Sequence, residues 1–295
     1  MPSVSTHNPA ATTADSRTVR PRRRGLAKHQ VFTGLGYFYL GSVALVSVFP
    51  LYFMAVSATN TSADVLGSRL IPGGNLMQNF RDLVEVSNLS TAMMNSAAVA
   101  VVTTILTLVV CSLAGYGFEI YHSKHKDRLM SVLLLSMMIP FAATMIPLFQ
   151  LFAKFGLINT LPAVILPTIS TPVMILLFRQ ASRSFPSSII EAARIDGLSE
   201  VAIFARIYLP TMRSTYAAAA VVTFMNAWNA FLWPKVVLVD MKFQTMPMLV
   251  SNLAAGYVTN YGVLMLAVFI ASLPTMIIFL VLQRTFANGI VGAIK

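Results

Sequence analysis

One stretch of this chain gathers charged side chains between two apolar segments. Only 11% of the 295 residues are charged, whereas a soluble domain averages about 25%. The stretch runs from Glu191 to Pro210, reads EAARIDGLSEVAIFARIYLP, and is charged at Glu191, Arg194, Asp196, Glu200 and Arg206. A helix that rests on lipid headgroups favours Lys and Arg on its polar face. Because these charges are mixed in sign, they favour ion pairing with a protein surface over binding to anionic lipid.

A second set of polar residues lies inside an apolar segment. Thr223, Asn226, Asn229 and Trp233 follow the spacing i, i+3, i+6, i+10, which places them on one face of a helix. In one interpretation they line a wet cavity for a neutral, hydroxylated solute, with Trp233 as a surface on which the solute stacks. In the other, Asn226 and Asn229 bond across to a neighbouring helix, an interaction worth about 0.6 kcal/mol. For Asn226 we favour the second interpretation.

No residue pattern in the chain indicates an enzyme, a cofactor or a metal site. The phosphate-binding pattern G-x-x-x-x-G-K-[ST] does not occur, so any function driven by ATP would need a separate subunit to bind the nucleotide. No catalytic residue is assigned, because the apolar segments contain no pair of carboxylates. His122 and His125 form H-x-x-H without companion ligands, which indicates a solvated basic loop. Cys111, the single cysteine, is interpreted as a small buried hydrophobe.

The elements that carry these residues are predicted to be membrane helices. The chain is 56% hydrophobic, and about 20 apolar residues are needed to cross a bilayer. Six segments qualify, and none contains Asp, Glu, Lys, Arg or His: 34–57, 92–116, 129–153, 161–178, 214–234 and 261–283. We therefore predict an all-α integral membrane protein, with a disordered basic tail at 1–30 and a six-span domain at 31–295. The prolines around the third and fourth spans predict kinked or interrupted helices.

The distribution of basic residues predicts the orientation. Most of the 21 Lys and Arg residues lie in the tail, in the loops after the second and fourth spans, and at the C-terminus. The positive-inside bias therefore places both termini and the loop 179–213 in the cytoplasm. It also explains the net charge of +11 without a nucleic-acid partner. The loops at 58–91 and 235–260 then face outward, either as plain connectors or as receivers of a partner protein.

The loop 179–213 is predicted to form two helices joined by a bend. Pro186 suits a helix start, with Ser184 or Ser187 as its cap. Gly197 interrupts an apolar pattern of helical spacing and marks the bend, because glycine costs about 1 kcal/mol in a helix interior relative to alanine. Leu209-Pro210 is expected to close the segment. Glu191, Arg194 and Glu200 are expected to face the cytosol.

The chain resembles a known family of transport proteins. The pattern Glu191-Ala192-Ala193, then Gly197, then Ile207-Tyr208-Leu209-Pro210 is similar to the cytoplasmic loop signature of permease subunits of binding-protein-dependent ABC importers. Two further stretches resemble the carbohydrate branch, specifically the maltose-type second permease. They are FMNAWNAFLWP at 224–234 and QRTFANGIVGAIK at 283–295. The resemblance covers most of the chain from about residue 30.

The resemblance implies a type I importer permease fold and a loop that inserts into a cleft of a separate ATPase. Glu191 would meet a basic group there, Gly197 would allow the bend, and the small side chains of Ala192 and Ala193 would permit close approach. The remaining ATPase-coupling residues carried over are Asp196, Ile207 and Pro210. In maltose-type pairs the substrate sits mainly on the partner permease.

The resemblance also implies the assembly and its location. The partners would be a homologous permease, an ATPase dimer that holds ATP and Mg²⁺, an extracytoplasmic solute-binding protein and the lipid bilayer, in the plasma membrane of a prokaryote. The function is then ATP-driven import of a sugar. The alternative is an ion-coupled secondary carrier. Such carriers need ionisable residues at membrane depth, and the six predicted spans contain none.

Overall fold

The computed structural model describes residues 24–256 and 259–294, with side chains described over 33–256 and 259–283. The described chain is helical and contains no strand, as predicted for an all-α membrane protein. It divides into two compact units, one ending at Pro50 and the other starting at Leu51. Helix α1 (Arg24–Ser57) begins before the predicted tail boundary at residue 30, whereas residues 1–23 of the tail lie outside the described residues.

Within the described residues, three helices are long and apolar enough to cross a membrane alone. They are α1, α4 (Leu89–Ile120) and α15 (Tyr261–Ile294). Two bent helix pairs raise the number of candidate spans to five if each pair counts as one. Helix α12 (Arg213–Trp228) has only 16 residues, so the predicted span 214–234 is not one continuous helix. The six-span arrangement therefore stays a prediction.

The predicted third and fourth spans are each broken at a proline, as their sequences indicated. Helices α5 (Lys124–Ser136) and α6 (Phe141–Lys154) meet at an angle of 99°, with Pro140 at the break. Helix α7 (Leu161–Ile165) and the 3₁₀ turn η1 (Leu166–Thr168) meet α8 (Pro172–Arg183) at 46°. Proline has no backbone N–H and clashes with the preceding turn, which accounts for the position of both breaks.

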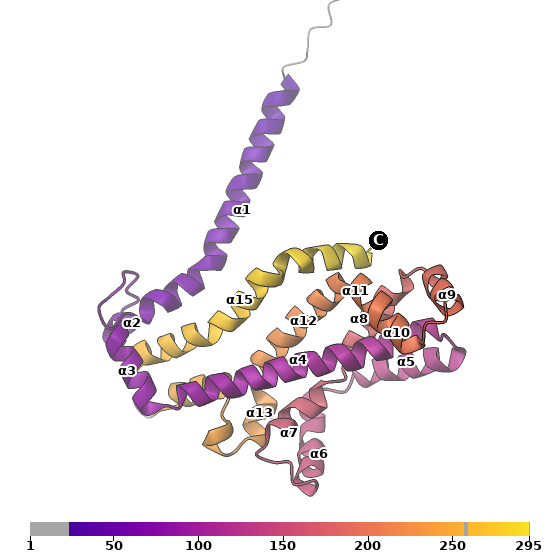
Figure 1. Cartoon of the computed structure of the whole chain (residues 1–295). Coiled ribbons are helices and arrows are strands. Elements are labelled where there is room, and N and C mark those ends of the chain that lie inside the picture. Colours follow the sequence, from indigo (N-terminus) through magenta and orange to yellow (C-terminus); the bar gives the residue numbers. More distant parts are fainter. Residues whose placement is uncertain (1–23, 257–258, 295) are drawn as a thin grey trace, which may run out of the picture. The chain divides into compact units, whose positions relative to one another are not determined.

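Helix α4 is the central element of the second unit. It packs against α8 and α12, and α12 packs against α15. Figure 1 shows α4 running from α3 (Leu76–Val86) at one end to α9 (Ser187–Ile195) at the other. The α12–α15 contact is pinned by Trp228, whose indole N–H donates to the Ala271 carbonyl at 2.9 Å. The arrangement leaves one functional candidate at the α9 end and another between the helices.

The opposite end is built from short helices. These are α2 (Ser62–Leu66), α3, α13 (Leu232–Val237), η3 (Met241–Phe243) and α14 (Met246–Ala254). Helix α3 lies within the loop 58–91 and α14 within the loop 235–260, the two loops that were expected to face outward. Asn79 ties this end together, because its buried side-chain amide donates to the carbonyls of Ala58 and Asn60 at 2.9 and 3.0 Å.

Candidate functional site

The bend predicted at Gly197 is present and separates two helices. Gly197 has φ of +78°, in the left-handed region that favours glycine. Its N–H donates to the Arg194 carbonyl at 3.0 Å, and the N–H of Leu198 donates to the Ala193 carbonyl at 3.0 Å. This pair of bonds is a Schellman motif, which satisfies the last carbonyls of a helix. Helix α9 therefore ends at a hydrogen-bonded C-cap, and a second helix, α10 (Glu200–Ile203), begins after the bend.

Two details of the predicted loop are wrong. Neither Ser184 nor Ser187 caps α9, whose N-cap position is held by Pro186 without a side-chain bond. The Ser184 hydroxyl donates instead to the Ala181 carbonyl at 2.7 Å. Pro210 also does not close the segment, because helix continues through the π-helical turn η2 (Phe204–Tyr208) into α11 (Leu209–Thr211). The wider π turn shifts the backbone bonding ahead of Pro210, which has no N–H to contribute.

The inner face of the loop is fixed to the helix bundle. Ile190, Ala193, Ile203 and Tyr208 are buried in one cluster with Tyr116 of α4. The hydroxyls of Tyr208 and Ser182 lie 2.7 Å apart and share a hydrogen bond. Burial raises the pKa of Tyr208 to about 12. The loop is therefore packed against α4 and α8 through buried side chains.

The outer face of the loop is exposed and partly apolar. Ile195 is 86% exposed and Val201 is 78% exposed. The same loop has a groove of 390 Å³, which is lined by Ser188, Ile189, Ala192, Ala193, Asp196, Leu198 and Ile207. Glu191 is exposed, and among the described residues it has no ion pair or hydrogen bond. Glu191 also borders a cleft of 460 Å³ that reaches Glu119 and Arg183.

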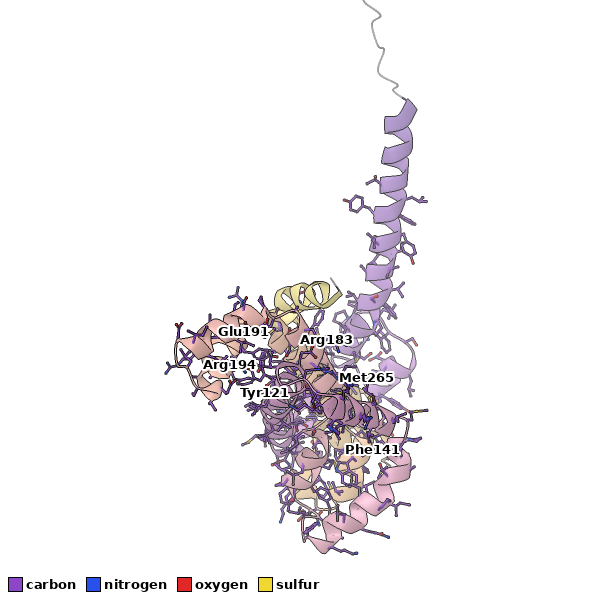
Figure 2. The ribbon with its side chains drawn as sticks, turned by 90° about the vertical axis from the view of Figure 1, so that its right-hand side faces the viewer. Tyr121, Phe141, Arg183, Glu191, Arg194 and Met265 are labelled. Atoms are coloured by element: carbon purple, nitrogen blue, oxygen red, sulfur yellow. The ribbon has the colours of Figure 1, made fainter. Side chains whose placement is uncertain are left out.

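Three charged residues were expected to face outward, and within the described chain only Glu191 makes no ion pair or hydrogen bond. Arg194 binds Glu200, with 2.7 Å between Nε and Oε1, and this bond lowers the pKa of Glu200. The Arg194 guanidinium also lies over the Tyr121 ring, 5.8 Å from its centroid. Figure 2 shows Glu191 and Arg194 on the loop with Tyr121 at the end of α4. The Arg194–Glu200 pair therefore connects the two sides of the bend at the surface of the loop, with side chains 40% and 44% exposed. Glu191 is left available to a partner.

The predicted coupling residues thus divide between the two faces. Glu191, Ala192 and Asp196 are exposed, and Ala193 is buried. Ile207 is half-buried at the edge of the groove, and Pro210 is exposed within the continued helix.

A Gly197→Ala variant is expected to lose about 1–2 kcal/mol of local stability, because an L-residue is strained at a left-handed φ. A matched control is Gly74→Ala. Both positions have open space for a Cβ, but only Gly197 has a positive φ. Hydrogen exchange of the 187–211 backbone amides measures the effect. Equal exchange in both variants would contradict the role of φ at the bend.

The sequence did not indicate an ion-pair network at the same end of the bundle. Arg179 on α8 is 5% exposed. Its Nε lies 3.1 Å from Glu119 Oε2 on α4, and its second guanidinium nitrogen lies 2.5 Å from Asp127 Oδ1 on α5. His122, which was expected in a solvated loop, binds Asp127 at 2.9 Å. The bond from Arg179 holds the pKa of Asp127 below its usual value. The network joins three helices directly beside the start of α9.

A second candidate site is a cavity of 180 Å³ between α4, α8, α12 and α13. It brings together Thr223, Asn226 and Trp233, three of the four predicted pathway residues. Asn229 does not line it, because α12 ends at Trp228 and the four residues do not share one helical face. The Asn229 amide donates to the Met225 carbonyl at 2.8 Å. The cross-helix bond that we favoured for Asn226 is not formed within the described residues.

Trp233 is a wall of this cavity. Its indole N–H donates to the Ala163 carbonyl at 2.9 Å, and its ring meets those of Phe141 and Phe152 edge to face at centroid distances of 6.0 and 5.9 Å. Trp233 is only 5% exposed, so its ring is held in place by the protein itself.

Comparison with known proteins identifies the family. A family model described as "Binding-protein-dependent transport system inner membrane component" matches residues 112–292, more than half of the chain. The chain belongs to this family. Within it, the chain is 43% identical over 259 residues to the lactose transport system permease protein LacG of Rhizobium radiobacter, covering 88% of this chain and 95% of that protein.

Further relatives of this permease carry different transport names. It is 36% identical to the arabinooligosaccharides transport system permease protein AraQ of Halalkalibacterium halodurans, covering 86% of this chain and 93% of the relative. It is 30% identical to the sn-glycerol-3-phosphate transport system permease protein UgpE of Pectobacterium atrosepticum, covering 85% and 93%.

The fold of this permease matches a solved ABC transporter. The structure of a bacterial ABC transporter involved in the import of the acidic polysaccharide alginate superposes with a TM-score of 0.77, covering 88% of this chain and 98% of that chain. The sequence identity is 20%, so the match supports the fold alone. The predicted ABC importer permease fold is confirmed. The chain is a membrane component of a transport system. Members of its family work with a binding protein, a second permease and an ATPase.

Proposed function

We propose that this permease is one membrane subunit of an ATP-driven sugar importer, and that its α9–α10 loop receives the motion of a separate ATPase. The observation that carries the proposal is the outer face of the loop. It combines an unpaired acid, Glu191, with the exposed apolar residues Ile195 and Val201 and with a groove. Exposed apolar patches of this kind mark interaction sites, and the mixed charges favour a protein partner over lipid.

The proposed assembly contains a homologous permease, an ATPase dimer that binds ATP and Mg²⁺, and an extracytoplasmic solute-binding protein. The α9 end would then lie in the cytoplasm of a prokaryotic cell, with both termini on that side of the plasma membrane. The groove beside Ala192 offers space for an ATPase side chain. Glu191 would bind a basic group at the separate cleft that it borders. Closure of the ATPase dimer would push the loop, and the packed cluster around Tyr208 would carry that push into α4 and α8.

The relatives and the spans together favour a neutral sugar as the solute. Two relatives are named for lactose and for arabinooligosaccharides, and a third for a phosphate ester. A phosphate group is bound by cationic side chains. The predicted spans contain no Lys, Arg or His, which favours the uncharged sugars.

The test is reconstitution of this permease with its partner permease and ATPase in proteoliposomes, with the binding protein and labelled sugar added. Glu191→Lys places a positive charge against the expected basic group, and like charges at an interface cost several kcal/mol. We expect uptake to fall tenfold or more, as about 1.4 kcal/mol already corresponds to tenfold. Glu191→Asp should retain most uptake.

A charge reversal away from the loop is the control. Lys124→Glu alters an exposed residue at the start of α5, and uptake should stay within a factor of about two, as expected for an exposed side chain without a partner. Wild-type uptake by the Glu191→Lys variant would refute the docking role. Uptake that needs no ATPase and follows a proton or sodium gradient would refute the importer and establish a secondary carrier.

A further inference from the structure

The cavity between the helices carries an array of neutral hydrogen-bonding side chains. Thr103 and Thr107 come from α4, Thr168 and Thr171 flank the break before α8, and Thr223 and Asn226 come from α12. Thr103 and Thr107 are four residues apart, and Thr223 and Asn226 are three apart, so each pair lies on one face of its helix. Three separate elements therefore present hydroxyl or amide groups to one cavity.

Some of these groups have no partner within the described chain. The hydroxyls of Thr103 and Thr223 are buried and make no hydrogen bond, and these residues are 1% and 6% exposed. The Asn226 side chain is exposed, and its amide also makes no hydrogen bond within the described residues. A neighbouring residue shows that this is not the ordinary state of a threonine in α4, since the Thr104 hydroxyl donates to the Ala100 carbonyl of its own helix at 2.6 Å. Buried polar groups without partners are costly.

The walls and the size of the cavity define what can enter it. Its lining contains no ionisable side chain, so no residue there would neutralise a phosphate or a carboxylate. A volume of 180 Å³ is far above the ~10–15 Å³ that one water requires. Trp233, fixed by its bond to Ala163, gives a rigid apolar wall. Apolar walls with a few placed polar groups are typical of small-molecule sites.

We propose that this cavity binds the transported solute directly, through Thr103, Thr223 and Asn226, and that the solute is a neutral polyhydroxylated molecule such as a sugar ring. Threonine hydroxyls and asparagine amides both donate and accept hydrogen bonds, so they match sugar hydroxyls without a charge. The inference rests on the proposed sugar importer and deepens it. It gives this subunit its own solute contacts, whereas the family resemblance places the substrate mainly on the partner permease.

Paired threonine variants test the site in the reconstituted complex. The double variant Thr103→Val/Thr223→Val keeps the side-chain shape and removes two hydroxyls. The control is Thr104→Val, a buried threonine of α4 outside the cavity lining. With whichever of labelled lactose or arabinooligosaccharide the wild type transports, we expect the double variant to lose about tenfold in uptake. The control should retain wild-type uptake.

The outcomes separate the inference from the proposed function. If the wild type transports neither sugar, the proposed function fails and the inference fails with it. If the wild type transports a sugar and the double variant matches it, the inference alone fails. A folding defect is not the expected cause of a loss, because valine removes an unpartnered hydroxyl. A raised melting temperature with full uptake would indicate a dry cavity and would overturn the proposal.

A labelling experiment gives a second readout that does not depend on the uptake rate. Cys111 is the only cysteine, so Asn226→Cys in a Cys111→Ala background is a single-cysteine protein. We expect a small hydrophilic methanethiosulfonate reagent to modify it, and the transported sugar to slow that reaction. Asn229→Cys in the same background is the control, since it lies outside the lining and should react without protection. Absence of labelling at Asn226→Cys, or labelling that sugar does not slow, would overturn the proposal.

Discussion

Replacement of Arg179 by alanine is expected to destabilise this permease by about 3 kcal/mol, the lower end of the range for breaking a buried ion pair. Arg179, on α8, is almost fully buried, and its guanidinium binds acids of α4 and α5. Its removal leaves Glu119, whose side chain is only 20% exposed, without its buried partner. The lower end of the range applies because the other acid in the network, Asp127, is 44% exposed and can bind water instead.

Arg183 offers a matched control in the same network. Its Nε lies 3.2 Å from the same Glu119 oxygen, but its side chain is 51% exposed. Exposed ion pairs contribute about 0–1 kcal/mol, so Arg183→Ala should change stability little. Thermal unfolding of the purified permease in detergent compares the two variants. Equal melting temperatures for Arg179→Ala and Arg183→Ala would show that burial does not set the strength of this contact.

A compensated variant separates charge from packing. Arg179→Leu combined with Glu119→Leu removes both members of the buried pair and fills the space with apolar side chains. Such replacements of a buried pair are often neutral or stabilising. We expect this double variant to melt above Arg179→Ala. If its stability recovers while sugar uptake does not, the network positions α8 and the loop that follows it for coupling, beyond holding them together.

Local signals in the sequence predicted the parts of the fold that depend on a few neighbouring residues. Gly197 shows this well, because glycine is disfavoured in a helix interior and readily adopts the left-handed φ that ends α9. Pro140 and Pro172 predicted the helix breaks for the same reason. The angles at those breaks, 99° and 46°, were not predictable, because they depend on how α6 and α8 pack against distant helices.

Contacts between distant residues account for what the sequence did not reveal. Glu119 and Arg179 are separated by 60 positions, and each was indistinguishable from the other charges that flank apolar spans. Arg194 and Glu200 were expected to face outward, and only the bend at Gly197 brings them together. In both cases the chain provides the charges, and tertiary structure decides which of them are paired.

The sequence likewise revealed only some of the polar residues that line the cavity within the spans. Asn226 stood out as an amide in an apolar helix, whereas Thr103 did not, because threonine in a helix usually bonds to its own backbone as Thr104 does. The expected face through Asn229 and Trp233 failed because α12 ends at Trp228. Residues share a helical face only while the helix continues. The sequence around Asn229 contains no glycine or proline that would have indicated the end of α12 at Trp228.

Two glycines of α4 are expected to respond to alanine with opposite signs. A Cβ at Gly115 would lie 2.6 Å from Phe178 Cβ and 2.7 Å from the Arg179 backbone nitrogen, whereas a Cβ at Gly117 would meet nothing within 4 Å. Alanine is favoured over glycine in a helix interior by about 1 kcal/mol, so Gly117→Ala should be neutral or stabilising. Gly115→Ala should destabilise by about 1–3 kcal/mol, the usual cost of overpacking.

The Gly115 contact is expected to matter beyond its own packing, because it lies directly against Arg179. Backbone atoms of α8 cannot rotate away from a new methyl group, so α4 and α8 must separate. The bond between Arg179 and Glu119 joins these two helices, so it must lengthen as they separate. The double variant Gly115→Ala/Arg179→Ala should therefore lose less stability than the two single variants lose together. Neighbouring sites that share partners are not independent. Melting temperatures of the two single variants and the double variant measure this coupling. Full additivity would mean that the close approach of the two helices and the ion-pair network stabilise the permease separately.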